Sequence, residues 1–491
     1  MDERISLFLN PPYERHIFTN RTLNMHSIQA IGYDMDYTLI HYDVTRWEQT
    51  MYEYLKRKVL ELGWPVEDLE YVPEMIIRGL VLDKKLGNIV KPNRFGYIKK
   101  AYHGTRQIEY GMMRNIYSRI TVDIRENRWL LLTTLFDVPV ACMYAQLVDR
   151  LDRQEFPEVM GYYDLEERMT SKLDAAYAEG MLREEILKDP SLYVVEDAET
   201  PLTLLDQKHA GKKLLLITDS EWEYVSGIMP FAFDSHLPDG MTWRDLFDMV
   251  IVSAGKPNFF LREQPALEVV TEEGLLRLVV GSLKEGAIYV GGHAGLVEET
   301  FGLQGGEIMY VGDHVESDVH ATKSILRWRT GLVLRELEKE LACMKRFRKE
   351  QMELSKMMIE KAKLEQEHLQ LKICVQRAEH RYGPVSALSV AELMNRIGEL
   401  EEKIADLNDR ISPLAQKAQE MFNPRWGLLT RAGIDKSYLV RQVEGYADIY
   451  TSRVSNFLYQ TPFAYLRSTR SSLPHDGGTL GGPHEGEAMV Y

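Results

Sequence analysis

The segment SIQAIGYDMDYTL (residues 27–39) decides how the chain is expected to fold. Its first part, up to Asp34, is mostly apolar and predicts a short buried strand. The strand ends in an acidic, turn-prone cluster, as a strand does when it delivers side chains to a site. Asp34 and Asp36 lie two residues apart, so both carboxylates can point into one site, because side chains alternate along a strand.

The same pattern, an apolar run followed by polar residues, returns three times. KKLLLITDS (212–220), FDMVIVSAGKP (247–257) and EIMYVGDH (307–314) each predict a strand, and residues 328–334 predict another. Strands separated by helical stretches indicate an α/β fold with a doubly wound, mostly parallel sheet. Ligands bind beyond the carboxyl ends of the strands in such sheets, and the four motifs lie at those ends.

The chain is expected to contain a core made of two segments, an inserted cap, a helical hairpin and a Gly-rich tail. Within the cap, short apolar runs alternate with turn signals over residues 78–104 and predict a small antiparallel sheet. Within the core, residues 276–281 and 287–292 are expected to form a hairpin. The expected boundaries are 1–40 and 205–335 for the core, with 421–475 packing back on it, 41–204 for the cap, 336–420 for the helical hairpin and 476–491 for a flexible tail.

The segment 336–420 is rich in Glu, Lys, Leu and Met. Gly383 and Pro384 interrupt a helical pattern, and Ser389 with Glu392 has the spacing of a capping box that restarts it. We expect an antiparallel pair of helices that packs partly on itself, and a contact between subunits is the alternative. The second helix carries a heptad stripe of Leu393, Ile397, Leu400, Ile404, Leu407 and Ile411.

Composition narrows the class of protein. The formal net charge of −15 argues against a general binder of nucleic acids or anionic membranes, because both need a positive surface. The three cysteines, Cys142, Cys343 and Cys374, are far apart and predict neither a disulfide framework nor a metal-binding spacing. With no signal peptide and no membrane-spanning run expected, we predict a cytoplasmic protein.

The first two motifs carry groups that suit phosphoryl transfer. Of Asp34 and Asp36, one can attack a phosphoryl group while the other protonates the leaving oxygen. Aspartates at strand ends are also common in turns. The hydroxyl and backbone N–H groups of Thr218, Asp219 and Ser220 can receive phosphate oxygens, or they can simply cap a helix.

The last two motifs supply charge. Lys256 can neutralise a phosphate and hold a neighbouring carboxylate ionised, although a lone lysine more often lies in solvent. Asp313 and Asp318 follow a buried strand, where acidic groups are costly unless they are paired or bind a metal. Magnesium prefers such hard oxygen ligands, whereas Gly-Asp alone is a turn signal. Four such motifs in this order, each at a strand end, are much harder to obtain by chance.

Together the motifs resemble the signature of the haloacid dehalogenase superfamily. The resemblance implies a Rossmann-like core, Asp34 as the nucleophile and Asp36 as the general acid and base. It implies that Thr218 and Lys256 bind phosphate, with Asp219 and Ser220 beside them. The cofactor it implies is Mg2+, and the residues around the ion would be Asp34, Asp36 through its carbonyl group, Asp313 and Asp318.

A narrower resemblance rests on DMDYTL, RGLVLDKKLGN, LTTLFDVP, KPNFF, YVGDH and the late GYADIY segment. These stretches are similar to the cytosolic purine 5′-nucleotidase family, from about residue 8 to residue 475. The similarity implies hydrolysis of purine nucleoside 5′-monophosphates, with IMP and GMP preferred, through an aspartyl-phosphate. It also implies transfer of the phosphoryl group to nucleosides in many members, and assembly as dimers or tetramers.

The same resemblance implies how the base is chosen. Phe136 would stack on the base, with Asp137 beside it, and Asp174 and Arg183 are candidates to read its edge. The departures from the family's pattern are Asp137 and Asp219, where an amide is common, and Thr170, where an arginine is expected.

Two alternatives stay open. The departures in the cap allow a phosphatase for another phosphorylated metabolite, such as a sugar phosphate. The helical hairpin allows a non-catalytic scaffold, although the complete set of acidic and basic site residues argues against this.

Overall fold

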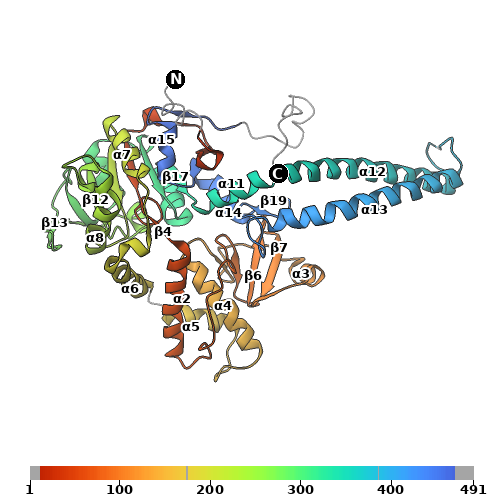
Figure 1. The fold of residues 1–491 in the computed structure, drawn as a ribbon, viewed down its shortest axis with the longest axis horizontal. Coiled ribbons are helices and arrows are strands. Elements are labelled where there is room, and N and C mark those ends of the chain that lie inside the picture. Colours follow the sequence, from red (N-terminus) through yellow and green to blue (C-terminus); the bar gives the residue numbers. More distant parts are fainter. Residues whose placement is uncertain (1–10, 173–174, 385, 470–491) are drawn as a thin grey trace. The chain divides into compact units, whose positions relative to one another are not determined.

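The computed structural model describes residues 11–172, 175–384 and 386–469 (Figure 1). The predicted tail at 476–491 lies outside these residues. These residues divide into two compact units, one formed by 11–339 with 429–469 and the other by 340–428. Among the described residues, no helix has the length and apolar character needed to cross a bilayer.

A ten-stranded sheet forms the centre of the first unit and confirms the predicted α/β, mostly parallel architecture. All neighbouring strands from β20 to β15 pair in parallel, and the edge strands β1, β13 and β14 pair antiparallel. The strand order is β1 (Phe18–Thr19), β20 (Ile449–Thr451), β17 (Arg329–Val333), β16 (Ile308–Gly312), β3 (Ala30–Tyr33), β11 (Lys213–Ile217), β12 (Met249–Val252), β15 (Ile288–Gly291), β13 (Ala266–Val269) and β14 (Leu276–Leu278).

Strand β3 lies between β16 and β11, and its register places the carboxyl ends of the three strands side by side. Tyr33 is opposite Val311 on one side and Leu216 on the other. Strand β12 continues on the far side of β11, with Ile251 opposite Ile217. The carboxyl ends of four neighbouring strands therefore meet at one edge of the sheet, where all four sequence motifs begin.

The central strands are apolar on both faces because both faces are covered. Leu214 and Leu216 of β11 belong to one buried cluster, and Leu215 and Ile217 to another. This explains why the strand is a continuous apolar run and does not alternate. Helices α7 (Glu199–His209) and α8 (Trp222–Phe233) contribute to the first cluster, and α10 (Ala294–Phe301) contributes to the second.

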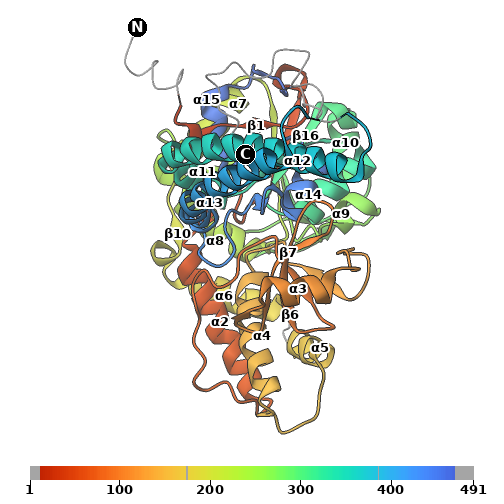
Figure 2. The same cartoon turned by 90° about the vertical axis from the view of Figure 1, so that its right-hand side faces the viewer.

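A large insert interrupts the core between β4 (His41–Tyr42) and β10 (Val194–Val195), which pair with each other. The insert (residues 43–193) contains a five-stranded antiparallel sheet, in which the segment 78–104 supplies three strands and two more, β8 and β9, come from the residues that follow it. Helices α2 and α4 of the insert lie alongside each other (Figure 2). Its elements are α2 (Val44–Leu60), β5 (Val81–Asp83), β6 (Asn88–Pro92), β7 (Ile98–His103), β8 (Arg106–Gln107), α3 (Tyr110–Tyr117), β9 (Trp129–Leu131), α4 (Asp137–Asp152), α5 (Tyr162–Lys172) and α6 (Ala175–Lys188).

One predicted pairing is wrong. The segments 276–281 and 287–292 do not form a hairpin with each other. Strand β14 pairs with β13, and β15 pairs with the other side of β13 while its second edge joins β12 in parallel. The sequence ALEV of β13 is too short and too mixed in polarity to stand out, so the strand between the two segments was missed.

The second unit contains the predicted pair of long helices, α12 (Arg348–His380) and α13 (Val390–Glu420), packed against each other (Figure 1). The capping box is present at the start of α13. Ser389 N donates to Glu392 Oε2 at 2.8 Å, and Glu392 N donates to Ser389 Oγ at 3.3 Å. Of the heptad stripe, the residues that are buried are Leu393, Ile397, Leu400, Leu407 and Ile411.

Asp448 anchors strand β20 to β17. Its side chain is fully buried and accepts bonds from Lys323 Nζ at 2.7 Å and from Thr330 N at 3.0 Å. Replacement by alanine would leave the partly buried ammonium group of Lys323 without its carboxylate. We therefore expect Asp448→Ala to lower the free energy of unfolding by about 3 kcal/mol, measured by chemical denaturation followed by circular dichroism.

The matched control is Asp68→Ala, which removes an exposed aspartate bonded to Arg150. It should change stability little, because exposed ion pairs contribute little. An Asp448→Ala protein as stable as Asp68→Ala would contradict the anchoring role.

Candidate active site

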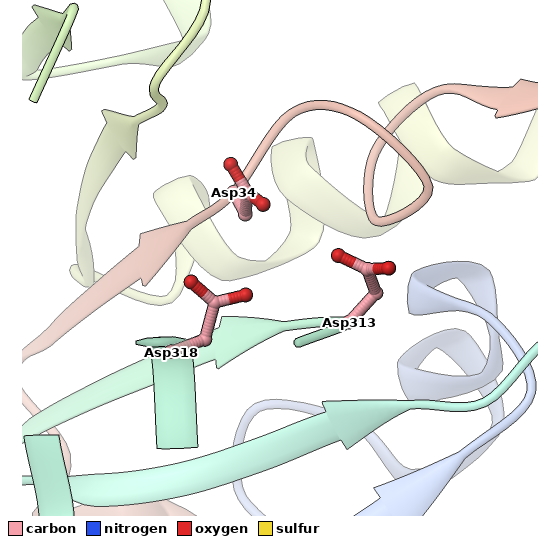
Figure 3. Close-up of side chains that lie close together, drawn as sticks. All are labelled: Asp34, Asp313 and Asp318. Carbon is pink, nitrogen blue, oxygen red and sulfur yellow. The ribbon is translucent and has the colours of Figure 1, made fainter. Parts of the chain in front are cut away.

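Three carboxylates converge beyond the strand ends (Figure 3). Asp34 directly follows β3, Asp313 directly follows β16, and Asp318 lies on the short π-helical segment Val315–His320. One oxygen from each carboxylate lies within 4.8 Å of the others. Asp34 and Asp318 are buried and Asp313 is partly exposed, so the cluster opens to solvent on the side of Asp313.

The ammonium group of Lys256 lies among these carboxylates. Its Nζ atom is 2.9 Å from Asp34 Oδ1, 2.8 Å from Asp318 Oδ1 and 3.2 Å from the hydroxyl of Tyr310. The three N–H groups of the ammonium thus face three acceptors. The backbone N–H of Lys256 donates to Asp219 Oδ1 at 2.8 Å, which ties the loop after β12 to the loop after β11.

Asp318 holds the cluster together, and both of its carboxylate oxygens already accept hydrogen bonds. Its Oδ1 accepts from Lys256, and its Oδ2 accepts from the backbone N–H of His314 at 3.0 Å. The carboxylate approaches so closely that a Cβ atom on Gly312 would lie 2.2 Å from Asp318 Oδ2. Only glycine at this position lets the carboxylate sit against the end of β16.

The electrostatics of the cluster favour an added positive charge. Burial raises the pKa of Asp34 well above its usual range, and Asp318 and Asp313 add to the shift against the opposing effect of Lys256. Burial and the charge of Asp318 raise the pKa of Asp313 to about 7. Burial alone would lower the pKa of Lys256, but Asp318 and Asp34 raise it well above its usual value, so the side chain is a cation.

The raised pKa of Asp313 has a consequence for stability. The folded protein keeps this proton up to about pH 7, whereas an unfolded aspartate loses it near pH 4. Stability from this group is therefore present at low pH and is lost as the pH rises through about 7. A divalent cation bound to the carboxylates would favour their ionised forms. The donor set, carboxylate oxygens with no sulfur or imidazole among the three, fits a hard ion such as Mg2+.

Asp36 points to a different set of partners. Its Oδ1 accepts a bond from the hydroxyl of Tyr42, and its Oδ2 accepts from the hydroxyl of Ser220. Thr218 Oγ1 is buried and accepts from Ser220 N at 3.1 Å. The structure therefore places Ser220 against Asp36 and Asp219 against the backbone of Lys256, two contacts that sequence reasoning did not anticipate.

Arg78 of the insert is a site neighbour that sequence reasoning missed. Its side chain is buried, and Nη1 donates to the backbone oxygen of Asp313 at 3.3 Å and lies 3.8 Å from Asp313 Oδ2. Nη2 donates to Glu336 Oε2 at 2.6 Å. The residue lies in the conspicuous stretch RGLVLD, but nothing in that stretch predicts contact with a loop more than two hundred residues away.

The loop before α4 lies next to the site. Thr133 Oγ1 is 3.5 Å from His314 Nε2. Asp137 Oδ2 accepts from the backbone N–H groups of Thr133 and Thr134, both at 2.8 Å, and so closes the loop on itself. The ring of Phe136 packs edge-on against Trp47, with centroids 4.7 Å apart.

Arg183 and Thr170 lie on helices of the insert. The guanidinium of Arg183 lies over the ring of Tyr224, 5.4 Å from its centroid. Thr170 Oγ1 donates to the backbone oxygen of Glu166 at 2.8 Å, an ordinary bond within a helix. Asp174 lies outside the described residues.

Fold and site define an α/β protein with an acidic, lysine-bridged centre at the ends of four strands. The 5' nucleotidase family matches residues 17–478, which include the core, the insert and the helical pair, and the chain belongs to that family. It is 26% identical over 474 residues to a 5'-nucleotidase domain-containing protein of Dictyostelium discoideum, a match that covers 94% of this chain and 74% of that protein.

The affinity of the site for a divalent cation should rise as the pH rises. A cation at Asp313 must displace a proton from a carboxyl group with a pKa of about 7. Calorimetric titration with Mg2+ should therefore give a Kd about tenfold higher at about pH 6 than at about pH 8, because one proton competes. In Asp313→Asn, binding should be weaker and its pH dependence flatter. Equal Kd values at the two pH values for the unaltered protein would show that Asp313 is not a ligand.

Proposed function

We propose that this protein hydrolyses purine nucleoside 5′-monophosphates, with IMP and GMP preferred, through a phosphorylated Asp34 and with Mg2+ as cofactor. The observation that carries the proposal is the buried contact between Lys256 Nζ and Asp34 Oδ1 at 2.9 Å, at the open edge of a parallel sheet. Lys256 opposes the rise in the pKa of Asp34, and together with bound Mg2+ it would keep the aspartate ionised as a nucleophile and attract a phosphate.

Phosphorylation of Asp34 is the first step. Oδ1 accepts from both Lys256 Nζ and the backbone N–H of Met35 at 2.8 Å. Among the described residues Oδ2 has no hydrogen-bond partner, so it is the oxygen that attacks phosphorus. Thr218 and Lys256 receive the phosphoryl oxygens, and the P–O bond to the nucleoside breaks as Asp36 gives a proton to the leaving 5′ oxygen.

Release of phosphate is the second step. Asp36, now ionised, takes a proton from a water molecule that attacks phosphorus, and the Asp34 carboxylate leaves. A nucleoside hydroxyl in place of water would give phosphotransfer by the same route. Bound Mg2+, held by Asp34, the Asp36 carbonyl group and Asp313, would supply positive charge to the phosphoryl oxygens.

The insert would act as the cap that selects the substrate. In this proposal Phe136 stacks on the base and Arg183 and Asp174 read its edge, in a cap that spans residues 41–204. The position of Thr133 beside His314 supports a role for this loop at the site. We also propose a cytoplasmic homo-oligomer, a dimer or tetramer, that has no nucleic-acid or membrane partner.

One contact favours a second candidate substrate. The carboxylate of Asp137, which stands where an amide is common, is already bonded to Thr133 N and Thr134 N. Asp137 therefore has fewer acceptor sites left for hydrogen bonds to a purine base. A phosphatase for another metabolite, such as a sugar phosphate, would use the same chemistry at Asp34 with a different fit in the cap.

Release of inorganic phosphate from a panel of phosphomonoesters tests the proposal. IMP and GMP should give the highest kcat/KM, and Asp34→Asn should lower kcat by more than about a thousandfold, because a carboxamide cannot form the acyl phosphate. Asp239→Asn, a change at an exposed aspartate, is the matched control and should leave the rate unchanged.

A sugar phosphate that exceeds every nucleotide by a wide margin would replace the substrate assignment and keep the nucleophile. Full activity in Asp34→Asn would contradict the nucleophile. No turnover of any phosphomonoester, together with a partner that binds through α12 and α13, would favour a scaffold.

A further inference from the structure

The connection between core and insert carries a residue that touches the site. The chain leaves the core through β4 and returns through β10, and the two strands pair antiparallel, with Tyr42 opposite Val194 and His41 opposite Val195. This two-stranded ribbon carries both chain connections between the core and the insert. Tyr42 is the last residue of the core before the insert begins.

The hydroxyl of Tyr42 is held in a fixed place. It donates to Asp36 Oδ1 and lies 2.9 Å from the hydroxyl of Tyr224 on α8. The ring of Tyr42 packs edge-on against Tyr37, with centroids 5.1 Å apart. Tyr42 is only 5% exposed, so neither ring nor hydroxyl has room to turn away.

The opposite oxygen of Asp36 is also engaged. Ser220, which follows β11, donates to Oδ2. With one donor on each oxygen, the plane of the carboxylate is set by two hydroxyl groups from two different elements. Tyr224, the partner of Tyr42, carries Arg183 of the insert over its ring. A chain of contacts therefore runs from helix α6 of the insert through Tyr224 and Tyr42 to Asp36.

We propose that Tyr42 is a positioning residue that sets the place of Asp36 for proton transfer and ties it to the link between core and insert. The inference rests on the proposed function, in which Asp36 gives a proton to the leaving oxygen. After Asp36 has given up that proton it is a carboxylate. Hydrogen bonds from the Tyr42 and Ser220 hydroxyls then stabilise its charge and fix its position. Proton transfer requires that the carboxyl group lies within hydrogen-bond reach of the leaving oxygen.

This role predicts an effect that depends on the leaving group. A nucleoside or sugar leaves as a strongly basic alkoxide and needs the proton as the P–O bond breaks. p-Nitrophenolate is a weak base and leaves without one. A change that only displaces Asp36 should therefore slow the alkyl ester and spare the p-nitrophenyl ester, whereas general damage to the fold should slow both alike.

The experiment compares kcat/KM for two substrates in the full-length protein with Mg2+. One is p-nitrophenyl phosphate, and the other is IMP, or a sugar phosphate if that is hydrolysed faster. Tyr42→Phe should lower kcat/KM for the alkyl ester by about tenfold or more, within the range that general acid catalysis supplies, and for p-nitrophenyl phosphate by less than about threefold. Asp36→Asn should show the same selectivity with a larger loss.

Two further variants serve as a control and as a second test of the Tyr42 role. Tyr144→Phe removes a buried hydroxyl that donates to the backbone of Tyr162 in the insert, and it should affect neither substrate. Tyr224→Phe removes the partner of Tyr42 and should give a smaller loss with the same selectivity. It carries the test if Tyr42→Phe does not fold.

The outcomes distinguish a wrong positioning role for Tyr42 from a wrong proposed function. If the unaltered enzyme is active and Asp36→Asn is selective, but Tyr42→Phe slows both substrates equally or neither, the positioning role is wrong and the proposed function stands. A Tyr224→Phe protein without any selectivity would overturn it in the same way. An unaltered protein that hydrolyses neither substrate would overturn the proposed function and this inference together.

Discussion

The ion pairs of Lys256 are the interaction on which the rest of the site depends. Burying two carboxylates as close as Asp34 and Asp318 would cost several kcal/mol each without a cation between them. Lys256 bonds to both. With Asp313, Arg78 and the Arg78 partner Glu336 included, four carboxylates face two cations, a balance of two negative charges when all are ionised. A divalent cation would neutralise this balance and so remove the repulsion that a phosphate dianion would otherwise meet.

The sheet provides the geometry that lets one lysine reach both aspartates. Strand β3 is flanked by β16 and β11, and β12 lies beyond β11, so residues that are far apart in sequence leave the sheet at one edge. Gly312 permits the close approach of Asp318 to the end of β16. The insert then adds Arg78, and strand β4, which leads into the insert, adds Tyr42, so the groups around the carboxylates come from both core and insert.

Much of this arrangement follows from the sequence for a physical reason. Lys256 and Asp313 each end an apolar run, and runs in a parallel sheet end at the same edge, so their meeting could be predicted without coordinates. Arg78 and Tyr42 could not be found this way. Arg78 reaches the site through the packing of the insert and Tyr42 reaches it from the short strand β4, and neither route leaves a local sequence pattern. The same holds for strand 266–269, whose pairing is decided by its neighbours.

Direct detection of the phosphorylated residue tests the account at its centre. The enzyme is mixed with IMP labelled on phosphorus, quenched in acid within the first turnover, digested, and mapped by mass spectrometry. The account predicts phosphate on the peptide that contains Asp34, removed by hydroxylamine as expected for an acyl phosphate. Label on another residue, or none at Asp34 while phosphate is released at the full rate, would contradict it.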